Sequence, residues 1–282
     1  LTVKRWHNRL RCHHCGYETR IPQACPGCQS KELKDLGEGT QRVETTVQAL
    51  LPSATILRID RDSTRNKGQL EAHLDEVKSG HADVVVGTQL LTKGHDFDHL
   101  SLVGVLDADQ GLYSSDFRST ENLFQQLVQV AGRAGRRDKQ GRVLVQTRFT
   151  DHPLFEFVVT QDYQGFANAE LEMRQQLGLP PFGYLAMFRA ESTHDARAMQ
   201  FLRALKTQLP VFDGVRVMDA VAAPMAKRAG RYRAQLLIQA QSRGALHTCL
   251  MSFIERLERH EGMRKLAGSV RWSLDVDPQD LY

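Results

Sequence analysis

The eight residues from Gln129 to Arg136 place two arginines and two glycines at the expected end of a helix and read QVAGRAGR. A guanidinium is permanently charged and matches phosphate oxygens with two parallel hydrogen bonds, and glycine lets backbone and ligand approach closely. Such arginines can stabilise the charge on a γ-phosphate from across an interface. The spacing allows Arg133 and Arg136 to point into one cleft. For the string taken alone, the favoured interpretation is a helix C-terminus whose basic residues complement the helix dipole.

A second segment of this kind lies upstream, from Val84 to Phe97, and reads VVVGTQLLTKGHDF. An apolar strand is expected to end at Gly87. Thr88 can then begin a helix and offer its hydroxyl and amide groups to a phosphate. A strand followed by Gly-Thr is common, so this segment gains weight only from its position before Gln129.

Four of the five cysteines share one window, as two CxxC pairs: Cys12, Cys15, Cys25 and Cys28. Two such pairs can supply four thiolates to a structural Zn²⁺ with no open position. Disulfide pairing and redox use of one pair are the alternatives, and neighbouring histidines could compete as ligands. Because no secretory signal is present, we expect reduced thiols and a cytoplasmic setting. Cys249 stands alone in an apolar stretch, which predicts a buried, inert thiol.

The elements that must position these residues divide the chain of 282 residues into three expected parts. Residues 1–36 form a Cys- and His-rich module that begins with Leu1, which suggests a piece of a longer protein. Residues 37–150 alternate helical and strand-like segments, which favours α/β architecture with a parallel sheet. Residues 151–282 begin with one long expected helix over 152–177. Two strand–helix–strand patterns follow, which predicts a small α+β domain.

A basic segment in the third part, Pro224 to Gln235, contains no acidic residue. A basic loop that leads into a strand can follow a phosphate backbone, while Tyr232 stacks on a base. A solvated hairpin with charges that protect a sheet edge is the equal alternative. The cationic side chains of this segment are Lys227, Arg228, Arg231 and Arg233.

The composition is that of a globular protein, with 41% hydrophobic and 25% charged residues. No apolar run approaches the roughly 18 residues that a membrane span needs. The net charge of +4 is weak evidence for a nucleic-acid partner, because a solvated surface explains it equally well.

Together, these segments resemble motifs V and VI of superfamily 2 helicases. With the cysteine pairs, the chain resembles the C-terminal portion of the primosomal replication-restart helicases. Strings that support the resemblance are Arg11 to Gly16, Arg58 to Asp62, Thr92 to His95, Asp116 to Ser119 and Asp275 to Pro278.

The resemblance implies a RecA-like second helicase lobe with a partial zinc-binding insertion, followed by a C-terminal domain that binds branched DNA. It implies an ATP-dependent 3′-to-5′ DNA helicase that starts primosome reassembly in the bacterial cytoplasm, at the nucleoid. ATP with Mg²⁺, Zn²⁺, single-stranded and forked DNA, single-stranded DNA-binding protein and primosome proteins are the implied cofactors and partners. The resemblance assigns catalytic roles at the ATP γ-phosphate to Gln129, Arg133 and Arg136. It assigns Gly94, Asp96 and Gly132 to the nucleotide, and to DNA it assigns Thr88, Gln89, Thr92 and Lys93.

Two departures from the family matter. The family pairs four CxxC motifs around two zinc ions, whereas two pairs are present here, so the cysteines could be halves of two sites. Zinc content by elemental analysis, near one or near zero per chain, would distinguish these arrangements. The sequence also contains no GxxxxGK[ST] phosphate loop and no DExH string. The chain is therefore expected not to hydrolyse ATP alone, and a DNA-binding scaffold with a motor-like lobe is the rival interpretation.

Overall fold

The computed structural model describes residues 2–4, 9–11, 18–24, 28–31, 39–60, 63–64, 66, 68–88, 100–114, 116–132 and 141–281. The chain forms two compact units: residues 22–163, and residues 1–21 together with 164–282. Each unit is described below by itself. The domain boundaries expected at residues 36 and 150 stay a prediction.

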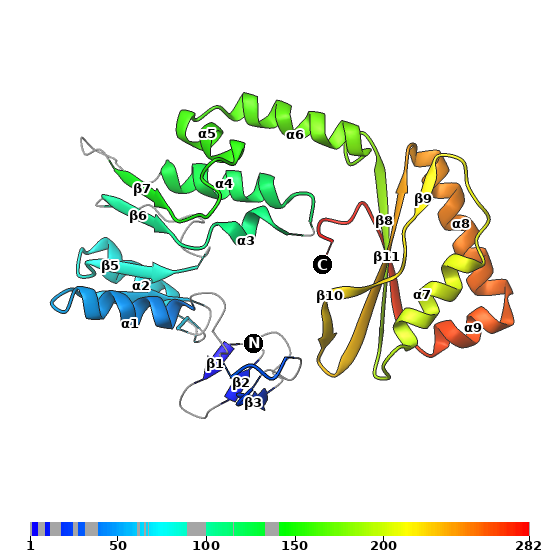
Figure 1. Ribbon diagram of the computed structural model, residues 1–282, viewed down its shortest axis with the longest axis horizontal. Coiled ribbons are helices and arrows are strands. Elements are labelled where there is room, and N and C mark those ends of the chain that lie inside the picture. The colour runs from blue at the N-terminus through cyan, green and yellow to red at the C-terminus, as the bar shows by residue number, and fades with distance from the viewer. Residues whose placement is uncertain are drawn as a thin grey trace. The chain divides into compact units, whose positions relative to one another are not determined.

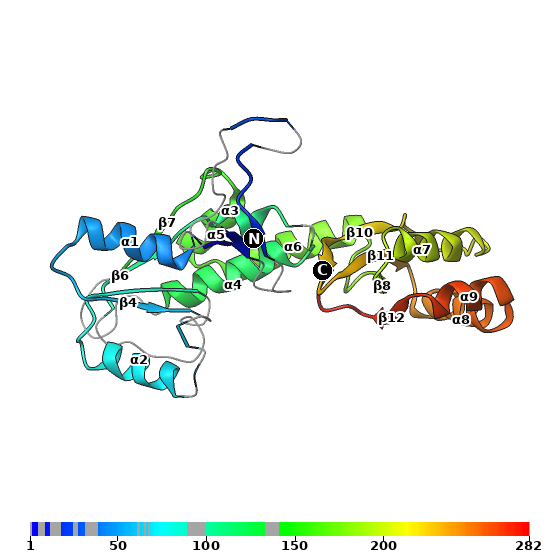
Figure 2. The same cartoon turned by 90° about the horizontal axis from the view of Figure 1, so that it is seen from below.

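The first half of the unit 22–163 is built around two parallel strands, β4 (Ile56–Ile59) and β5 (Val84–Gly87). The helices α1 (Thr40–Leu50) and α2 (Gln69–Lys78) lie on opposite sides of this pair (Figure 2). A right-handed connection through a helix is what parallel pairing requires. The alternating pattern of the sequence therefore predicted these elements and their parallel direction.

The second half of this unit repeats the arrangement with β6 (Leu102–Val105) and β7 (Arg142–Val145), which also pair in parallel. The short helix α3 (Asp109–Leu112) and the longer α4 (Ser119–Ala131) connect these two strands, and α5 (Pro153–Thr160) follows. Four residues of α4 lie buried along one stripe: Leu123, Phe124, Leu127 and Val130. This i, i+4, i+7 spacing directs the polar side chains of α4 away from the core.

The single helix expected over residues 152–177 was wrong. The chain forms α5 and then α6 (Tyr163–Leu177), separated at Gln161, whose φ is +55°. The amide of Asp162 donates to the carbonyl of Phe157 at 2.9 Å, which closes α5 with a left-handed cap. Glycine usually takes this cap position, so a glutamine there gave no stop signal in the sequence.

Near the N-terminus, three short strands form an antiparallel sheet in the order β1-β2-β3, with bounds Thr2–Lys4, Arg9–Arg11 and Glu18–Arg20. Antiparallel strands this close in sequence need only short turns to pair. The first two expected zinc ligands fall between β2 and β3, outside the described residues.

The C-terminal part of the chain, residues 184–276, forms an antiparallel sheet in the order β10-β11-β8-β12, and β9 also pairs with β11 (Figure 1). The strands are β8 (Tyr184–Ser192), β9 (Val215–Val217), β10 (Val221–Arg228), β11 (Arg231–Ala240) and β12 (Arg271–Val276). The helices α7 (Arg197–Thr207), α8 (Arg243–Arg259) and α9 (Glu261–Gly268) all cover one face of this sheet. The expected small α+β domain is confirmed.

The core of this domain lies between the sheet and its three helices. Alternate residues of β8 and β11 point into it, because successive side chains of a strand face opposite sides. Phe188 and Phe253 are fully buried there, with ring centroids 4.8 Å apart. Cys249 is also fully buried, and burial raises the pKa of its thiol to about 11. The expectation of a buried thiol is confirmed.

The opposite face of the sheet carries no helix of its own. A short segment after β12, residues 277–281, crosses part of this face, and we call it the C-terminal strap. The amide of Asp277 donates to the carbonyl of Leu185 at 2.9 Å, and Pro278 is buried. Leu185 and Met187 each retain 1% exposure although they point away from the helices. The strap explains why two apolar residues on this face are shielded from water.

No helix among the described residues is long and apolar enough to cross a membrane.

Candidate functional site

Helix α4 carries the described end of the arginine motif. Gln129 lies on its exposed side in the last turn, and Gly132 ends the helix with its amide donating to the carbonyl of Val128 at 2.9 Å. A β-carbon added at Gly132 would lie 3.5 Å from that carbonyl oxygen, in ordinary contact. Arg133 and Arg136 lie outside the described residues. The structure therefore places the base of the motif on a solvent-facing helix end, and the roles of all four residues stay predictions.

A buried carboxylate positions the start of α4. Asp116 is 5% exposed, and its side chain accepts a hydrogen bond from the amide of Arg118 at 2.9 Å. Its backbone carbonyl accepts from the amide of Ser119 at 3.0 Å, so the aspartate closes the turn that leads into the helix. The sequence offered Asp116 only as part of a supporting string. An aspartate three residues before a helix start was the signal for this role.

Thr88 and Asp60 follow neighbouring parallel strands. Ile59 of β4 is paired with Gly87 of β5, so the residues after them emerge at the same edge of the strand pair. Ligands of α/β proteins bind at such carboxyl edges. Thr88 is exposed there. The structure thus supports the expected position of Thr88 at a ligand-binding edge, without showing a ligand.

Asp60 is the structural centre of this edge, and sequence reasoning missed it. Its carboxylate accepts hydrogen bonds from the Thr40 hydroxyl at 2.5 Å, the Arg58 guanidinium at 2.7 Å and the amide of Ser63 at 2.8 Å. The serine three residues after the aspartate was the available signal, since this spacing is typical of an Asx turn. Asp60 joins the start of α1 to the end of β4.

The other lobe residues assigned by the resemblance lie outside the described residues: Gln89, Thr92, Lys93, Gly94 and Asp96. Cys12, Cys15 and Cys25 also lie outside them, while Cys28 is exposed and free. Among the residues that the structure describes, no three His, Cys, Asp or Glu side chains form a metal-binding group. The zinc assignment stays a prediction that depends on thiolate chemistry alone.

The basic segment 224–235 is an antiparallel hairpin rather than a loop. β10 and β11 are joined by Ala229 and Gly230, whose φ values are +47° and +77°. Two successive positive φ angles define a type I′ turn, which matches the twist of a hairpin. The sequence left a loop and a hairpin as equal alternatives, since the alanine at the first turn position is an unusual choice for positive φ.

The hairpin divides its charged residues between two faces. Lys227 and Tyr232 are paired across the strands, with the ammonium 3.1 Å from the phenol oxygen, to which it donates, and 4.3 Å from the ring centroid. Tyr232 shares its side of β11 with the buried Ala234. Arg231 and Arg233 alternate with these residues and point to the face opposite the helices. Tyr232 is therefore on a different face from the arginines with which it was grouped.

On the open face, Arg228 and Arg231 are direct cross-strand partners. Like charges in this position destabilise a sheet, so the sequence keeps a local cost here that stability does not explain. Glu191 is the nearest carboxylate, 3.9 Å from Arg231 and 4.0 Å from Arg271, which makes only long ion pairs. A phosphate could relieve the repulsion between the two arginines by bridging them.

Arg189 fixes the C-terminal strap. Its guanidinium lies 2.6 Å from Asp275 and donates to the backbone carbonyl of Asp280 at 2.8 Å. Gln235 of the neighbouring strand donates to the carbonyl of Leu281 at 3.2 Å. The sequence predicted none of these contacts, because they join residues up to 91 positions apart.

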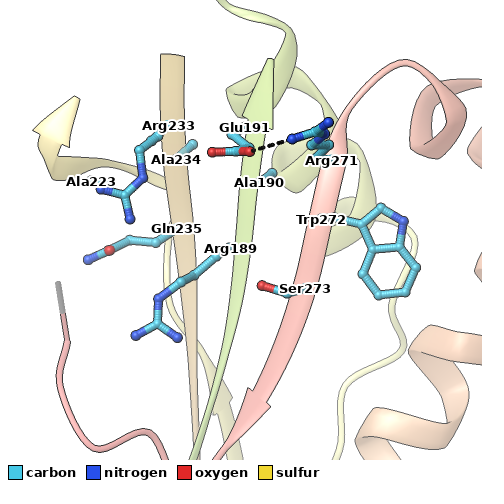
Figure 3. Close-up of a pocket in the computed structure, with 10 residues that line it drawn as sticks. All are labelled: Arg189, Ala190, Glu191, Ala223, Arg233, Ala234, Gln235, Arg271, Trp272 and Ser273. Atoms are coloured by element: carbon cyan, nitrogen blue, oxygen red, sulfur yellow. Dashed lines mark ion pairs between the residues drawn. The ribbon is translucent and has the colours of Figure 1, made fainter. Parts of the chain in front are cut away.

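Beside the strap, the open face is hollowed into a shallow pocket of about 270 Å³. Figure 3 shows Arg189, Arg233 and Gln235 extending to one side of the sheet, whereas Trp272 extends to the other. The polar residues of the pocket come from three strands: Arg189, Glu191, Arg233, Gln235, Arg271 and Ser273.

The comparisons with known proteins agree with the two parts of the structure. Residues 33–138 match the family model of the helicase conserved C-terminal domain, and residues 175–279 match that of the primosomal protein N C-terminal domain. The chain is 42% identical to the replication restart protein PriA of Haemophilus influenzae over 283 residues, which cover 99% of this chain and 38% of the relative. The chain is homologous to PriA proteins over almost its whole length.

PriA of Bacillus subtilis is 37% identical over 99% of the chain and 34% of its own length, and PriA of Synechocystis is 38% identical over 95% of the chain and 32% of its own length. The chain thus spans about a third of the length of these PriA relatives. A solved dimeric ferredoxin-like protein from an uncultured marine organism aligns with 33% of the chain and 92% of its own length, at 10% identity and a TM-score of 0.26, too low to bear on the fold.

Proposed function

We propose that this chain is the C-terminal part of an ATP-dependent 3′-to-5′ DNA helicase that recognises stalled or branched forks and initiates primosome assembly for replication restart. The observation that carries the proposal is the presence of both family domains in one chain that matches PriA relatives over almost its whole length. The helicase conserved C-terminal domain alone would not distinguish a replication-restart protein from other helicases.

In this proposal, residues 37–150 form a RecA-like second lobe that closes against a first lobe absent from this sequence. Arg133 and Arg136 would contact the γ-phosphate of ATP, and Gln129 would act beside them. Gly94, Asp96 and Gly132 would contact the nucleotide. The phosphate loop and the ligands of Mg²⁺ would come from the first lobe. The exposed end of α4, where the motif begins, supports these nucleotide-binding roles.

DNA would lie along the residues that follow β5, where Thr88, Gln89, Thr92 and Lys93 would contact its backbone. Closure of the lobes on ATP would then move the bound strand. The exposed position of Thr88 at the carboxyl edge of β5 supports this role. The remaining parts of the proposal rest on the family resemblance. They are zinc bound by the CxxC pairs, single-stranded DNA-binding protein and primosome proteins as partners, and a bacterial cytoplasmic location.

We expect no DNA-stimulated ATP hydrolysis from the isolated 282-residue chain, because its sequence lacks a phosphate loop. Phosphate release with and without forked DNA measures this directly, and the control is a longer chain that includes the first lobe. Robust hydrolysis by the isolated chain would contradict the assignment. A longer chain that also fails to hydrolyse ATP would favour the rival function, a non-catalytic DNA-binding scaffold.

The hairpin arginines are expected to bind the phosphate backbone of the fork. Changing Arg228 and Arg231 to Glu should weaken fork binding about tenfold or more at moderate salt and lower the slope of log K against log salt by about one per lost contact. Fluorescence anisotropy at several salt concentrations measures both quantities.

The matched control is the double change Arg203→Glu with Arg264→Glu, which makes the same charge change at exposed positions of α7 and α9, on the helix-covered side of the domain. It should reproduce only the general effect of net charge. If the hairpin variant binds the fork as tightly as the control at every salt concentration, the hairpin is not a DNA-binding element.

A further inference from the structure

The pocket on the open face holds hydrogen-bonding groups that a phosphate alone would not use. The carbonyl oxygen of the Gln235 side chain is buried and has no hydrogen-bond partner among the described residues. A buried acceptor without a partner destabilises the folded state, so a site that retains one can accept a hydrogen bond from a ligand that carries a donor. Phosphate oxygens at neutral pH are mainly acceptors and would repel this atom.

Beside this acceptor lies a free donor. Within the part of the chain that the structure describes, the guanidinium of Arg233 has no hydrogen-bond or ion-pair partner. Its cross-strand partner is Glu191, whose carboxylate instead makes ion pairs of 3.9 and 4.0 Å with Arg231 and Arg271. Pairs this long leave capacity on the carboxylate oxygens for another hydrogen bond.

The pocket therefore presents donors and acceptors side by side on a sheet face. With a volume of about 270 Å³ it is smaller than most sites for drug-sized ligands. Proteins read unpaired bases by hydrogen bonds to the base edges, and an arginine plane can replace an aromatic ring as the stacking surface. The like-charged pair of Arg228 and Arg231 lies on the same face, where it can hold the adjoining phosphate.

We propose that this pocket binds one unpaired base of a single-stranded nucleic acid, with Glu191 and Gln235 accepting from the base and Arg233 donating to it. A guanine fits best, because its Watson–Crick edge places two N–H donors beside a carbonyl acceptor. The proposal rests on the DNA-binding function proposed for the hairpin and adds to it a contact with the base itself. Arg189 also lines the pocket, but Asp275 and Asp280 engage its guanidinium, so no contact with the base is assigned to it.

The test uses single-stranded DNA nine nucleotides long. Every position is abasic except the central one, which carries guanine, adenine or thymine. A fully abasic strand is the reference. The 282-residue chain should bind the guanine strand about fivefold to tenfold more tightly than the fully abasic strand. Glu191→Gln and Arg233→Gln should each remove most of this preference while the fully abasic strand stays bound. Glu258→Gln and Arg264→Gln, which make the same changes on exposed helix positions, should retain it.

Two results would overturn the proposal: equal binding of the guanine and abasic strands by the unchanged chain, or a guanine preference that survives both pocket variants. Neither result depends on Arg228 or Arg231. If Arg228→Glu with Arg231→Glu still weakens binding of the abasic strand, phosphate binding by the hairpin stands and only the base contact fails. If this double change has no effect but the guanine preference persists and follows the pocket variants, the base contact stands alone.

Discussion

Changing Arg133 to Lys in a chain that also contains the first motor lobe is expected to lower the rate of DNA-stimulated ATP hydrolysis about 10³-fold. An arginine that reaches the γ-phosphate stabilises transition-state charge, and such groups contribute about 10³- to 10⁵-fold to the rate. Lysine keeps the charge but loses the planar pair of donors that binds two phosphate oxygens. The effect should therefore appear in kcat, with nucleotide affinity changed only a few-fold.

The control for this variant is Arg142→Lys, because Arg142 is exposed on β7 in the same unit and outside the motif. Both variants should bind forked DNA as the unchanged protein does. Equal hydrolysis by the two variants would show that Arg133 is not the arginine of the ATP site. A loss of nucleotide binding rather than of kcat would assign it to ground-state binding.

Changing Phe253 to Ala is expected to destabilise the C-terminal domain by about 3 to 5 kcal/mol. The side chain is fully buried, and its ring contacts that of Phe188 on β8, so truncation leaves a cavity between α8 and the sheet. The chain has two tryptophans, and Trp272 lies 6.1 Å from Phe188 between ring centroids. In a Trp6→Phe background, urea unfolding followed by Trp272 fluorescence reports on this domain alone.

Met251→Ala on the same helix provides the comparison, because Met251 is 51% exposed. It should change the free energy of unfolding by less than about 0.5 kcal/mol. A Phe253 variant as stable as the Met251 variant would mean that the sheet and α8 do not share the core described above.

Much of the fold followed from the sequence because its signals are local. The buried stripe of α4 and the apolar runs of β4 and β5 each lie within a few residues, so periodicity is enough to identify them. The interruption at Gln161 was missed because a left-handed cap formed by glutamine has no distinctive local signature. The turn at Ala229 also lacks a distinctive local signature, so a loop and a hairpin stayed equal alternatives there.

The candidate site likewise contains residues that the sequence identified and contacts that only the tertiary structure revealed. The arginine motif and the basic hairpin were visible in the sequence because their residue types and spacing carry the signal. What only the tertiary structure decided was which residues share a face. Strand pairing turned Tyr232 away from Arg231 and brought Glu191 beside Arg233 from a distant strand. Strand register also placed Arg189 and Gln235 on this face, where both hold the strap. Such contacts depend on register, which no local pattern encodes.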